Sequence, residues 1–394
     1  MLPFKLIYSD GYYLPIGAHV FPAEKYRRIA ERLLETKLAQ PEDFLTPHPA
    51  KDEDILLVHK PDYVHKLKTG TLSAREEMQL EVPYSPELVQ AFWLAAGGSI
   101  LAARQALEDG VAISIGGGFH HAFSDHGEGF CMVNDVAVAI RRMQHDGKIR
   151  RAMTVDCDVH QGNGTASIFA GMRIPTKPLP SWSAPGLGRA SFGPERLEQE
   201  QIPPVGRNDK SLRDESLGDK SGDKSLEDKS LGDEVDTTEL DAPESTDPQA
   251  VIRHAHDGDV FTISLHQQNN YPAWKPPSSI DVDLPDGIGD ADYLAWLDNA
   301  LSSGLRHFEP DLICYIAGAD PYKDDQLGGL ALTLEGLQRR DELVFRVARA
   351  CNIPVMVTYA GGYARNLDDT VTIHCNTVQA AKNIFVRPPV STSC

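Results

Sequence analysis

The sequence predicts an α/β fold: a single domain with a mostly parallel central sheet, helices on both faces, and a disordered insertion. Apolar strand-like runs alternate with helical periodicity along most of the 394-residue chain. Strands separated by helices form a parallel sheet that is covered on both faces. With 41% hydrophobic residues, the chain can bury a sizeable core. One acidic, low-complexity stretch interrupts the alternation.

The predicted elements follow one another in a regular order. Residues 22–38 have helical spacing, and Pro22 suits a first turn. Residues 86–108 are typical of a long, mostly buried helix with small residues at a close contact. After it we expect strand 111–116, helix 134–144, strand 152–158, helix 164–170, strand 260–265, helix 291–307, strand 311–317, helix 333–350, strand 354–359 and helix 376–384.

The interruption spans residues 171–256, which we predict to be an acidic, largely disordered insertion. The surrounding domain would comprise 1–170 and 257–388, followed by a tail at 389–394. Within 207–247, 14 residues are acidic, 6 are basic and none is aromatic. Such a segment buries too little apolar surface to offset its ordering entropy. It leaves a helix and returns to the start of a strand, so we expect it at the amino ends of the strands. A tether that docks a partner protein is the alternative to a neutral insertion.

Composition and charge exclude several classes of protein. The net charge of −19 argues against a nucleic-acid partner, which needs basic stripes, but is compatible with a cationic ligand. No apolar run reaches the length of a transmembrane helix, and the first residues lack a signal-peptide pattern. We therefore expect no membrane partner and a cytoplasmic location, with the nucleus as the alternative. The six cysteines show no CxxC pairing, which favours reduced core thiols.

Residues that bind metals follow two of the predicted strands. In TVDCDVHQGNG (154–164), alternation places Asp156, Asp158 and His160 on one face of a buried strand. Three ionisable groups there are costly without a partner, which a divalent cation supplies. We expect Asp158 and His160 to be ligands, the alternative being a helix cap or a hydrogen-bonded core pair. Asp320, after the next apolar strand, is the expected third ligand unless it caps the following loop. This donor set suits Zn²⁺, and Fe²⁺ nearly as well.

Residues that can move a proton follow two further strands. His120 and His121 come closely after three glycines, where one imidazole can accept a proton and the other can stabilise charge. Exposed loop histidines are the alternative. Tyr363 can donate a hydrogen bond to an oxyanion, and a core tyrosine is the alternative. Because the carboxyl ends of parallel strands share one edge, we expect all these residues in one crevice. That convergence indicates a metal-dependent hydrolase.

With these residues in place, the chain resembles the histone deacetylase family, whose fold is the arginase–deacetylase fold. The features HVFPAEKY (19–26) and HQGNG (160–164) look most like the class IV branch and its bacterial relatives. The strongest blocks are GGGFHHAFSDHGEGFCMVNDVAVAI (116–140), VDCDVHQGNGTASIF (155–169), AGADPYKDDQLGGLALT (317–333) and YAGGY (359–363).

The resemblance implies how the matched residues act. The three candidate ligands match the family's zinc ligands, and Tyr363 matches the tyrosine that polarises the scissile carbonyl. His121 matches the usual general base. His120 matches the first histidine of the tandem, which Asp156 supports. Asn163 stands where many members carry aspartate as the partner of His121, and an amide supports an imidazolium less well than a carboxylate does.

The resemblance also implies a channel for the acyl-lysine substrate. Gly129 and Phe130 match one wall of this channel, and Leu327 lines the same tunnel. The family's rim aspartate, which grips a peptide backbone, has no match here, because no aspartate occurs between Asp62 and Asp109.

A structural potassium site is a further implication of the resemblance. Asp156 and Ser264 match its side-chain ligands. The backbone carbonyl groups of Asp158, His160 and Leu265 match the remaining ligands.

The sequence as a whole predicts a zinc-dependent amidohydrolase that removes acyl groups from N-acyl-lysine in a protein or peptide. Small acylated amines such as acylpolyamines are the alternative substrates within the same fold. An arginase-like dimanganese enzyme is disfavoured, because a bimetallic site needs more carboxylates. The alternative from a different class is a non-catalytic scaffold that binds acyl-lysine.

Overall fold

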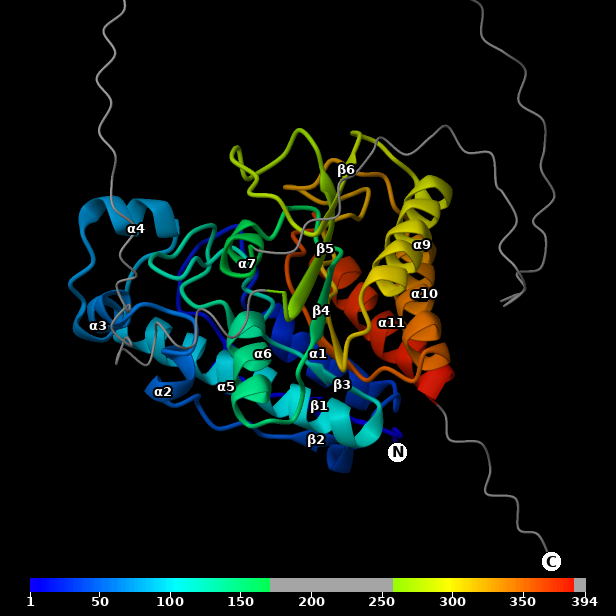
Figure 1. Ribbon diagram of the computed structural model, residues 1–394, viewed down its shortest axis with the longest axis horizontal. Coiled ribbons are helices and arrows are strands. Elements are labelled where there is room, and N and C mark those ends of the chain that lie inside the picture. The colour runs from blue at the N-terminus through cyan, green and yellow to red at the C-terminus, as the bar shows by residue number, and fades with distance from the viewer. Residues whose placement is uncertain (171–257, 386–394) are drawn as a thin grey trace, which may run out of the picture. The chain divides into compact units, whose positions relative to one another are not determined.

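A parallel sheet organises the computed structural model, which describes residues 1–170 and 258–385. Within these residues, eight strands form one sheet in the order β2-β1-β3-β8-β7-β4-β5-β6, and every pairing is parallel. The α/β fold with a parallel central sheet is thereby confirmed (Figure 1). The strands are β1 (Lys5–Ile7), β2 (Phe44–Leu45), β3 (Val111–Ser114), β4 (Ala152–Asp156), β5 (Val260–Gln267), β6 (Ile280–Leu284), β7 (Leu312–Ile316) and β8 (Val355–Thr358).

Helices cover both faces of the sheet. Helix α5 packs on β1, β3 and β8 and contacts α6. Helix α9 packs on β5 and β6 and contacts α10, which contacts α11, and α11 in turn contacts α1 (Figure 1). Two 3₁₀ turns, Asp10–Tyr12 and Pro41–Asp43, precede and follow α1. The helices are α1 (Lys25–Glu35), α2 (Asp52–Ile55), α3 (Pro61–Thr69), α4 (Ala74–Leu80), α5 (Pro86–Asp109), α6 (Asp135–His145), α7 (Asn163–Ile168), α9 (Asp290–His307), α10 (Leu334–Ala350) and α11 (Leu367–Phe385).

Most predicted elements differ from the structure by a few residues at their ends, and two of these differences have a clear cause. The helix expected at 376–384 begins earlier, at Leu367. Its first turn contains Asp368 and Asp369, and acidic residues stabilise the N-terminus of a helix. The strand expected at 152–158 ends at Asp156. There the N–H of Asp158 donates to Asp156 Oδ1 at 3.1 Å instead of to a neighbouring strand. The chain therefore leaves the sheet two residues early.

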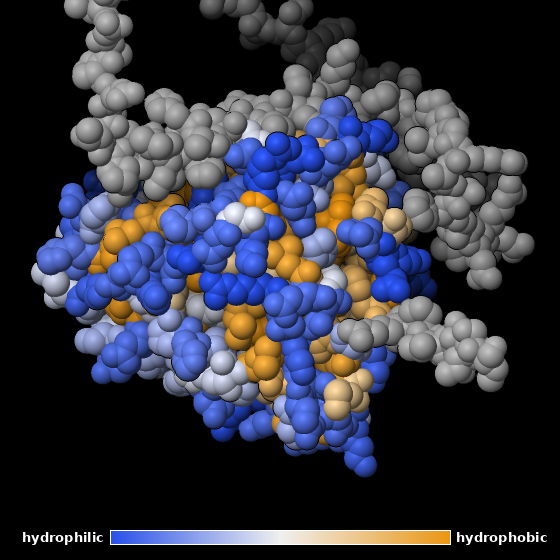
Figure 2. Space-filling view, turned by 60° about the horizontal axis from the view of Figure 1, so that its bottom comes forward, coloured by the Kyte–Doolittle hydropathy of each residue, from blue (hydrophilic) through white to orange (hydrophobic). Residues whose placement is uncertain are grey.

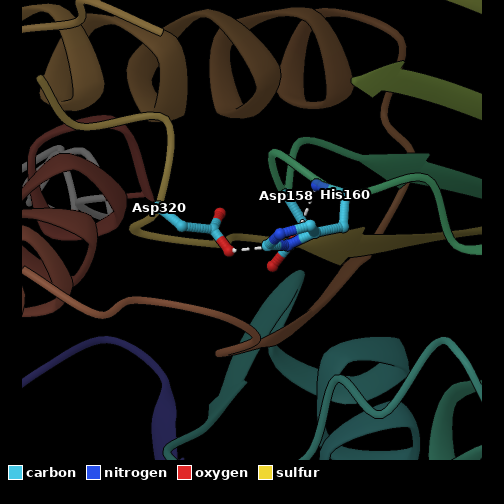
Figure 3. Close-up of side chains that lie close together, drawn as sticks. All are labelled: Asp158, His160 and Asp320. Atoms are coloured by element: carbon cyan, nitrogen blue, oxygen red, sulfur yellow. Dashed lines mark hydrogen bonds and ion pairs between the residues drawn. The ribbon is translucent and has the colours of Figure 1, made fainter. Parts of the chain in front are cut away.

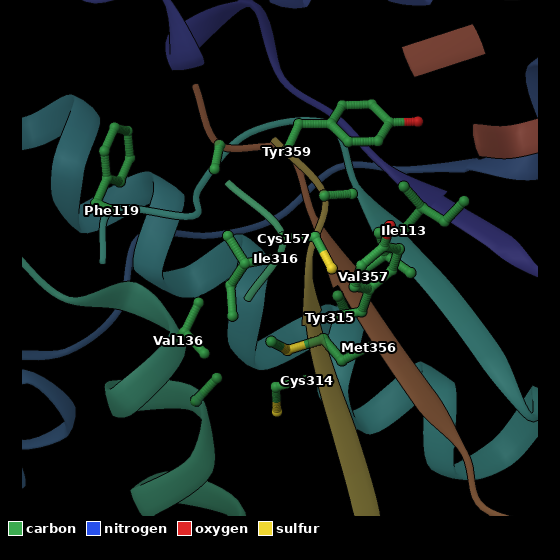
Figure 4. Close-up of a cluster of buried hydrophobic side chains, with 14 of the residues drawn as sticks. Ile113, Phe119, Val136, Cys157, Cys314, Tyr315, Ile316, Met356, Val357 and Tyr359 are labelled. Atoms are coloured by element: carbon green, nitrogen blue, oxygen red, sulfur yellow. The ribbon is translucent and has the colours of Figure 1, made fainter. Parts of the chain in front are cut away.

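The core lies between the sheet and its helices. Figure 4 shows side chains from β3, β7, β8 and α6 packed together, among them Ile113, Val136 and Met356. Full burial of a side chain of this size contributes about 1.5–3 kcal/mol to folding. The five cysteines in the described residues are free thiols, and Cys131, Cys157 and Cys314 are buried.

The surface shown in Figure 2 is mainly hydrophilic, with apolar patches between the polar residues. Single exposed hydrophobic residues are normal on a folded protein. In the part of the chain that the structure describes, no helix has the length and apolarity needed to cross a membrane. The predicted insertion at 171–256 and the tail lie outside the described residues.

Candidate active site

Four neighbouring strands end at the same edge of the sheet. In the order β3-β8-β7-β4, their last residues are Ser114, Thr358, Ile316 and Asp156. The segments that follow these strands carry the candidate histidines, tyrosine and metal ligands. Because carboxyl ends of parallel strands share one edge, four segments that are distant in sequence meet above the middle of the sheet.

Asp158, His160 and Asp320 form a buried cluster above this edge. One potential ligand atom from each lies within 4.8 Å of the others. Figure 3 shows two of these side chains on the segment after β4 and Asp320 on the segment after β7, turned toward one another. His160 Nδ1 lies 3.1 Å from Asp158 Oδ1 and 3.4 Å from Asp320 Oδ2.

Backbone groups hold the outer oxygen of each carboxylate. Asp158 Oδ2 accepts the N–H of Gly361 at 2.7 Å, and Asp320 Oδ1 accepts the N–H of Val159 at 2.8 Å. Asp320 Oδ2 is buried without a hydrogen-bond partner. A Cβ atom at position 361 would lie 1.9 Å from that oxygen, so the close approach requires glycine.

The electrostatics of this cluster fit a divalent cation. Burial raises the pKa of Asp320, and the neighbouring charge of Asp158 raises it further. Two buried carboxylates with an orphaned oxygen and one imidazole are costly without a compensating cation. The same donor set is typical of a metal site that keeps positions open for other ligands.

The tandem histidines are buried beside the cluster, so the alternative of exposed loop histidines is wrong. Their rings lie 4.1 Å apart. Each ring faces a different partner through Nδ1: His120 lies 2.7 Å from Asp156 Oδ2, and His121 lies 2.7 Å from Asn163 Oδ1. One histidine is thus paired with a carboxylate and the other with an amide.

These partners separate the pKa values of the two rings. Burial lowers the pKa of His120, but Asp156 and Asp158 more than offset this and raise it to about 9. Burial also lowers the pKa of His121, and the neighbouring rings of His120 and His160 hold it well below its usual value. Paired groups with separated pKa values are typical of acid–base sites. His120 is therefore suited to carry a positive charge, whereas His121 is neutral.

A channel leads from the surface to the cluster. Its outer part has a volume of about 200 Å³ and is lined by Glu81, His121, Gly129, Phe130, His160, Asn270, Tyr271, Leu327 and Tyr363. A smaller inner space of about 20 Å³ lies beyond it, between Phe21, Phe119, Cys131 and the catalytic edge. The predicted wall residues therefore share one channel with the candidate tyrosine, which is itself buried.

The wall of the channel has a backbone that few side chains tolerate. Gly129 and Phe130 both have positive φ, of 53° and 68°. A Cβ at position 129 would lie 2.9 Å from His121 Cδ2 and 3.0 Å from the Tyr271 ring. Phe130 donates its N–H to the carbonyl of Leu80 at 3.0 Å. Such uncommon conformations are found where a site must be held in place.

Comparison with known proteins agrees with this architecture. The protein-family model of the histone deacetylase domain matches residues 19–174 and 249–378 of this chain. The chain belongs to the histone deacetylase family. An uncharacterized protein of Picosynechococcus is 33% identical over 97% of this chain and 99% of its own length. Histone deacetylase 2 of Arabidopsis thaliana is 28% identical over 92% of this chain and 75% of its own length. The solved structure of a histone deacetylase homologue from Aquifex aeolicus has a TM-score of 0.64 at 19% identity and covers 98% of this chain, with 84% of its own chain covered.

Membership of the histone deacetylase family supports a hydrolase of the deacetylase type. The matched segments include both carboxylates, the tandem histidines and the tyrosine described above. They also include residues of the channel that the sequence analysis did not single out. Glu81 and Tyr271 line the channel, and Glu128 accepts a hydrogen bond from Asn163 next to it.

Glu81 is the acidic residue at the mouth of the channel. It follows α4 as the C-cap residue with a φ of 62°, and burial together with the nearby Glu128 raises its pKa. Glu81 provides a carboxylate at this position although no aspartate occurs between Asp62 and Asp109. Tyr271 places its ring 5.1 Å from that of His121, yet it follows β5 with no local signal. Lys25 is also buried, with Nζ donating to the carbonyl of Ala360 at 2.6 Å.

Two residues of the predicted potassium site are neighbours in the sheet. Asp156 and Ser264 lie opposite each other in the register of β4 and β5. Ser264 Oγ lies 2.9 Å from His266 Nδ1. Ligation of potassium by these side chains and by the carbonyl groups of Asp158, His160 and Leu265 stays a prediction.

Proposed function

We propose that this histone deacetylase family member hydrolyses the amide of N-acetyl-lysine in a metal-dependent reaction. The observation that carries the proposal is the meeting of the buried Asp158–His160–Asp320 cluster with the histidine pair and Tyr363 in one channel. A non-catalytic binder has no need for a neutral base beside a ligand cluster.

Asp158, His160 and Asp320 would hold the cation, with Zn²⁺ proposed ahead of Fe²⁺. When bound, the cation supplies Lewis-acid activation of the scissile carbonyl and of water. The buried, orphaned Oδ2 of Asp320 supports this assignment, because a resident cation would satisfy it.

The remaining steps fall to the histidines and the tyrosine. His121 accepts a proton from the attacking water at Nε2, since its Nδ1 faces Asn163. The same nitrogen then passes the proton to the leaving amine. His120, paired with Asp156, stabilises the developing negative charge. Tyr363 donates its phenolic hydrogen to the oxyanion.

The two parts of the channel support a short acyl group on a long aliphatic stem. Phe130, Tyr271 and Leu327 provide apolar walls for four methylene groups. The inner space of about 20 Å³ is close to the 10–15 Å³ or so that a single water requires. A space of this size suits a small group such as a methyl group at the end of the stem. We therefore propose acetyl-lysine ahead of long-chain acyl-lysine.

Glu81 favours a second candidate substrate. A carboxylate at the mouth can accept a hydrogen bond from a peptide N–H, or it can pair with the second amine of an acetylated polyamine. The acidic net charge of −19 suits the cationic polyamine as well as a basic peptide.

The test compares matched substrates with the Zn²⁺-loaded, Fe²⁺-loaded and chelator-treated protein. The substrates are an acetyl-lysine peptide, the same peptide with a long-chain acyl group, and an acetylated polyamine. We expect chelator-sensitive release of amine from the acetyl-lysine peptide. Faster turnover of the polyamine would select the second candidate. No turnover of any substrate at full metal occupancy would refute the hydrolase.

A further inference from the structure

A carboxylate stands directly behind the amide that contacts His121. Glu128 Oε1 accepts a hydrogen bond from Asn163 Nδ2 at 2.6 Å, and Asn163 Oδ1 lies 2.7 Å from His121 Nδ1. We propose that Glu128 is a positioning residue for the general base and that it acts through Asn163. This inference rests on the proposed function, because it concerns the base of that reaction.

The carboxylate determines which way the Asn163 amide points. A carboxylate only accepts hydrogen bonds, so the NH₂ group of Asn163 must face Glu128. The amide oxygen then faces His121, an orientation that the N–H of Gly164 also favours by donating to Oδ1 at 3.0 Å. The opposite orientation would set two acceptors against each other at 2.6 Å.

The orientation of the amide in turn determines the tautomer of His121. An amide oxygen only accepts, so the proton of the neutral ring lies on Nδ1 and Nε2 carries the lone pair. Only this tautomer can accept a proton at Nε2. Glu128 thereby selects the form of the base that can react.

Glu128 is itself held as an anion. Tyr271 donates its hydroxyl to Oε1 at 3.0 Å, and Gln79 donates Nε2 to Oε2 at 3.1 Å. Burial raises the pKa of Glu128, but hydrogen bonds from His126, Gln79, Asn163 and Tyr271 outweigh this and lower it to about 2. An aspartate at position 163 would contact His121 directly. In this chain the negative charge lies on Glu128, and Asn163 stands between it and His121.

Glu128 also fixes a second neighbour of the base. The ring of Tyr271 lies edge-on to His121 with centroids 5.1 Å apart, and its hydroxyl is bound to the same carboxylate oxygen as Asn163. A loss of activity on removing Glu128 therefore has two possible routes. The double variant E128Q/N163D, which exchanges the carboxylate of Glu128 with the amide of Asn163, separates the two routes.

The experiment measures kcat and KM on the acetyl-lysine peptide for E128Q, N163D and the double variant E128Q/N163D, with metal content checked in each. N163D brings two carboxylates together at the 2.6 Å contact, so we expect kcat to fall about 10- to 100-fold. In E128Q the glutamine can present either its oxygen or its NH₂ group to Asn163, so the amide is no longer held in one orientation and kcat should fall about tenfold. In the double variant the glutamine amide donates to the new carboxylate, and kcat should return to within about threefold of wild type. KM should stay within about twofold throughout.

Two controls identify the route. Gln79→Ala removes a donor from the opposite oxygen of Glu128 but leaves its contact with Asn163 in place, so kcat should fall less than in E128Q. Tyr271→Phe removes the hydroxyl but keeps the ring. If the decreases in kcat of the two single variants multiply in the double variant, the role of Asn163 is overturned. It is also overturned if Tyr271→Phe lowers kcat as much as E128Q does and the double variant does not restore kcat.

A readout that does not need turnover separates this inference from the proposed function. With histidine-selective ¹⁵N labelling, and with His121→Gln to assign the signal, the wild type should show the Nδ1–H tautomer. Glu128→Leu should populate the Nε2–H tautomer. Unchanged spectra would refute the positioning role even in an active enzyme. The expected spectra in an inactive protein would refute only the hydrolase.

Discussion

A pH-dependent loss of stability should arise at His59, which lies beneath the active-site segments. The side chain is 1% exposed, and Nε2 accepts the N–H of Asn134 at 3.1 Å, which requires a neutral ring. Asn134 in turn donates Nδ2 to the carbonyl of Ala122 at 3.2 Å and to Thr165 Oγ1 at 3.0 Å. Protonation of His59 would therefore disturb the support of the tandem histidines.

The magnitude follows from the two pKa values. Burial lowers the pKa of His59 from 6.5 to about 4 in the folded protein. Between these values the unfolded chain binds a proton that the folded chain does not, so stability rises with pH. The contribution is complete above pH 6.5 and is lost as the pH falls toward 4. The difference between a pKa of 6.5 and one of about 4, at about 1.4 kcal/mol per pH unit, gives about 3–4 kcal/mol in all, most of which is lost at pH 4.5.

Urea unfolding at pH 7 and pH 4.5 measures this contribution. His59→Gln is the matched variant, because the glutamine oxygen can accept the N–H of Asn134 and does not titrate. The other buried histidines are common to both proteins and cancel in the comparison. We expect the wild type to lose about 2 kcal/mol more than the variant between the two pH values. Equal losses would refute the account of His59 as a buried neutral ring.

Three further predictions concern the site and the insertion. Tyr363→Phe should lower kcat about 100- to 1000-fold while metal content is unchanged, and near-normal activity would remove the phenol from the mechanism. Gly129→Ala should lower kcat at least about tenfold, because its Cβ would meet His121 at 2.9 Å and φ is positive; equal kcat at equal thermal stability would contradict this. Deletion of 207–247 should leave kcat within about twofold, as expected for a segment at the amino ends of the strands, and a large fall with the fold preserved would show that the insertion acts in catalysis.

The sequence predicted the central part of this site through a local signal and a general rule. Short apolar runs followed by glycines marked the ends of four strands. Because the carboxyl ends of parallel strands share one edge, the residues that follow these strands were predicted to lie close together. The structure brings Asp158, His160 and Asp320 together as that rule required. Histidine burial could not be read from the sequence, because it depends on which segments close over the loop.

The residues that were missed lie on segments whose paths depend on packing. Glu128 lies inside the glycine-rich segment, and its meaning comes from contacts with Asn163 and Tyr271, which are distant in sequence. Strands β1 and β2, at one end of the sheet, have three and two residues, too few to show a period. Strand β6 (IDVDL) alternates with acidic residues and lies beyond an irregular loop.

The strand order also determines how the protein can be made. Strands β3 and β4 are synthesised before the predicted insertion, but β8 and β7 lie between them in the sheet and are synthesised after it. A growing chain therefore displays two unpaired strand edges and two of the three cluster residues until the last strand has left the ribosome. Such edges are sites of aggregation. We therefore expect two separately expressed halves to become soluble only when they are produced together.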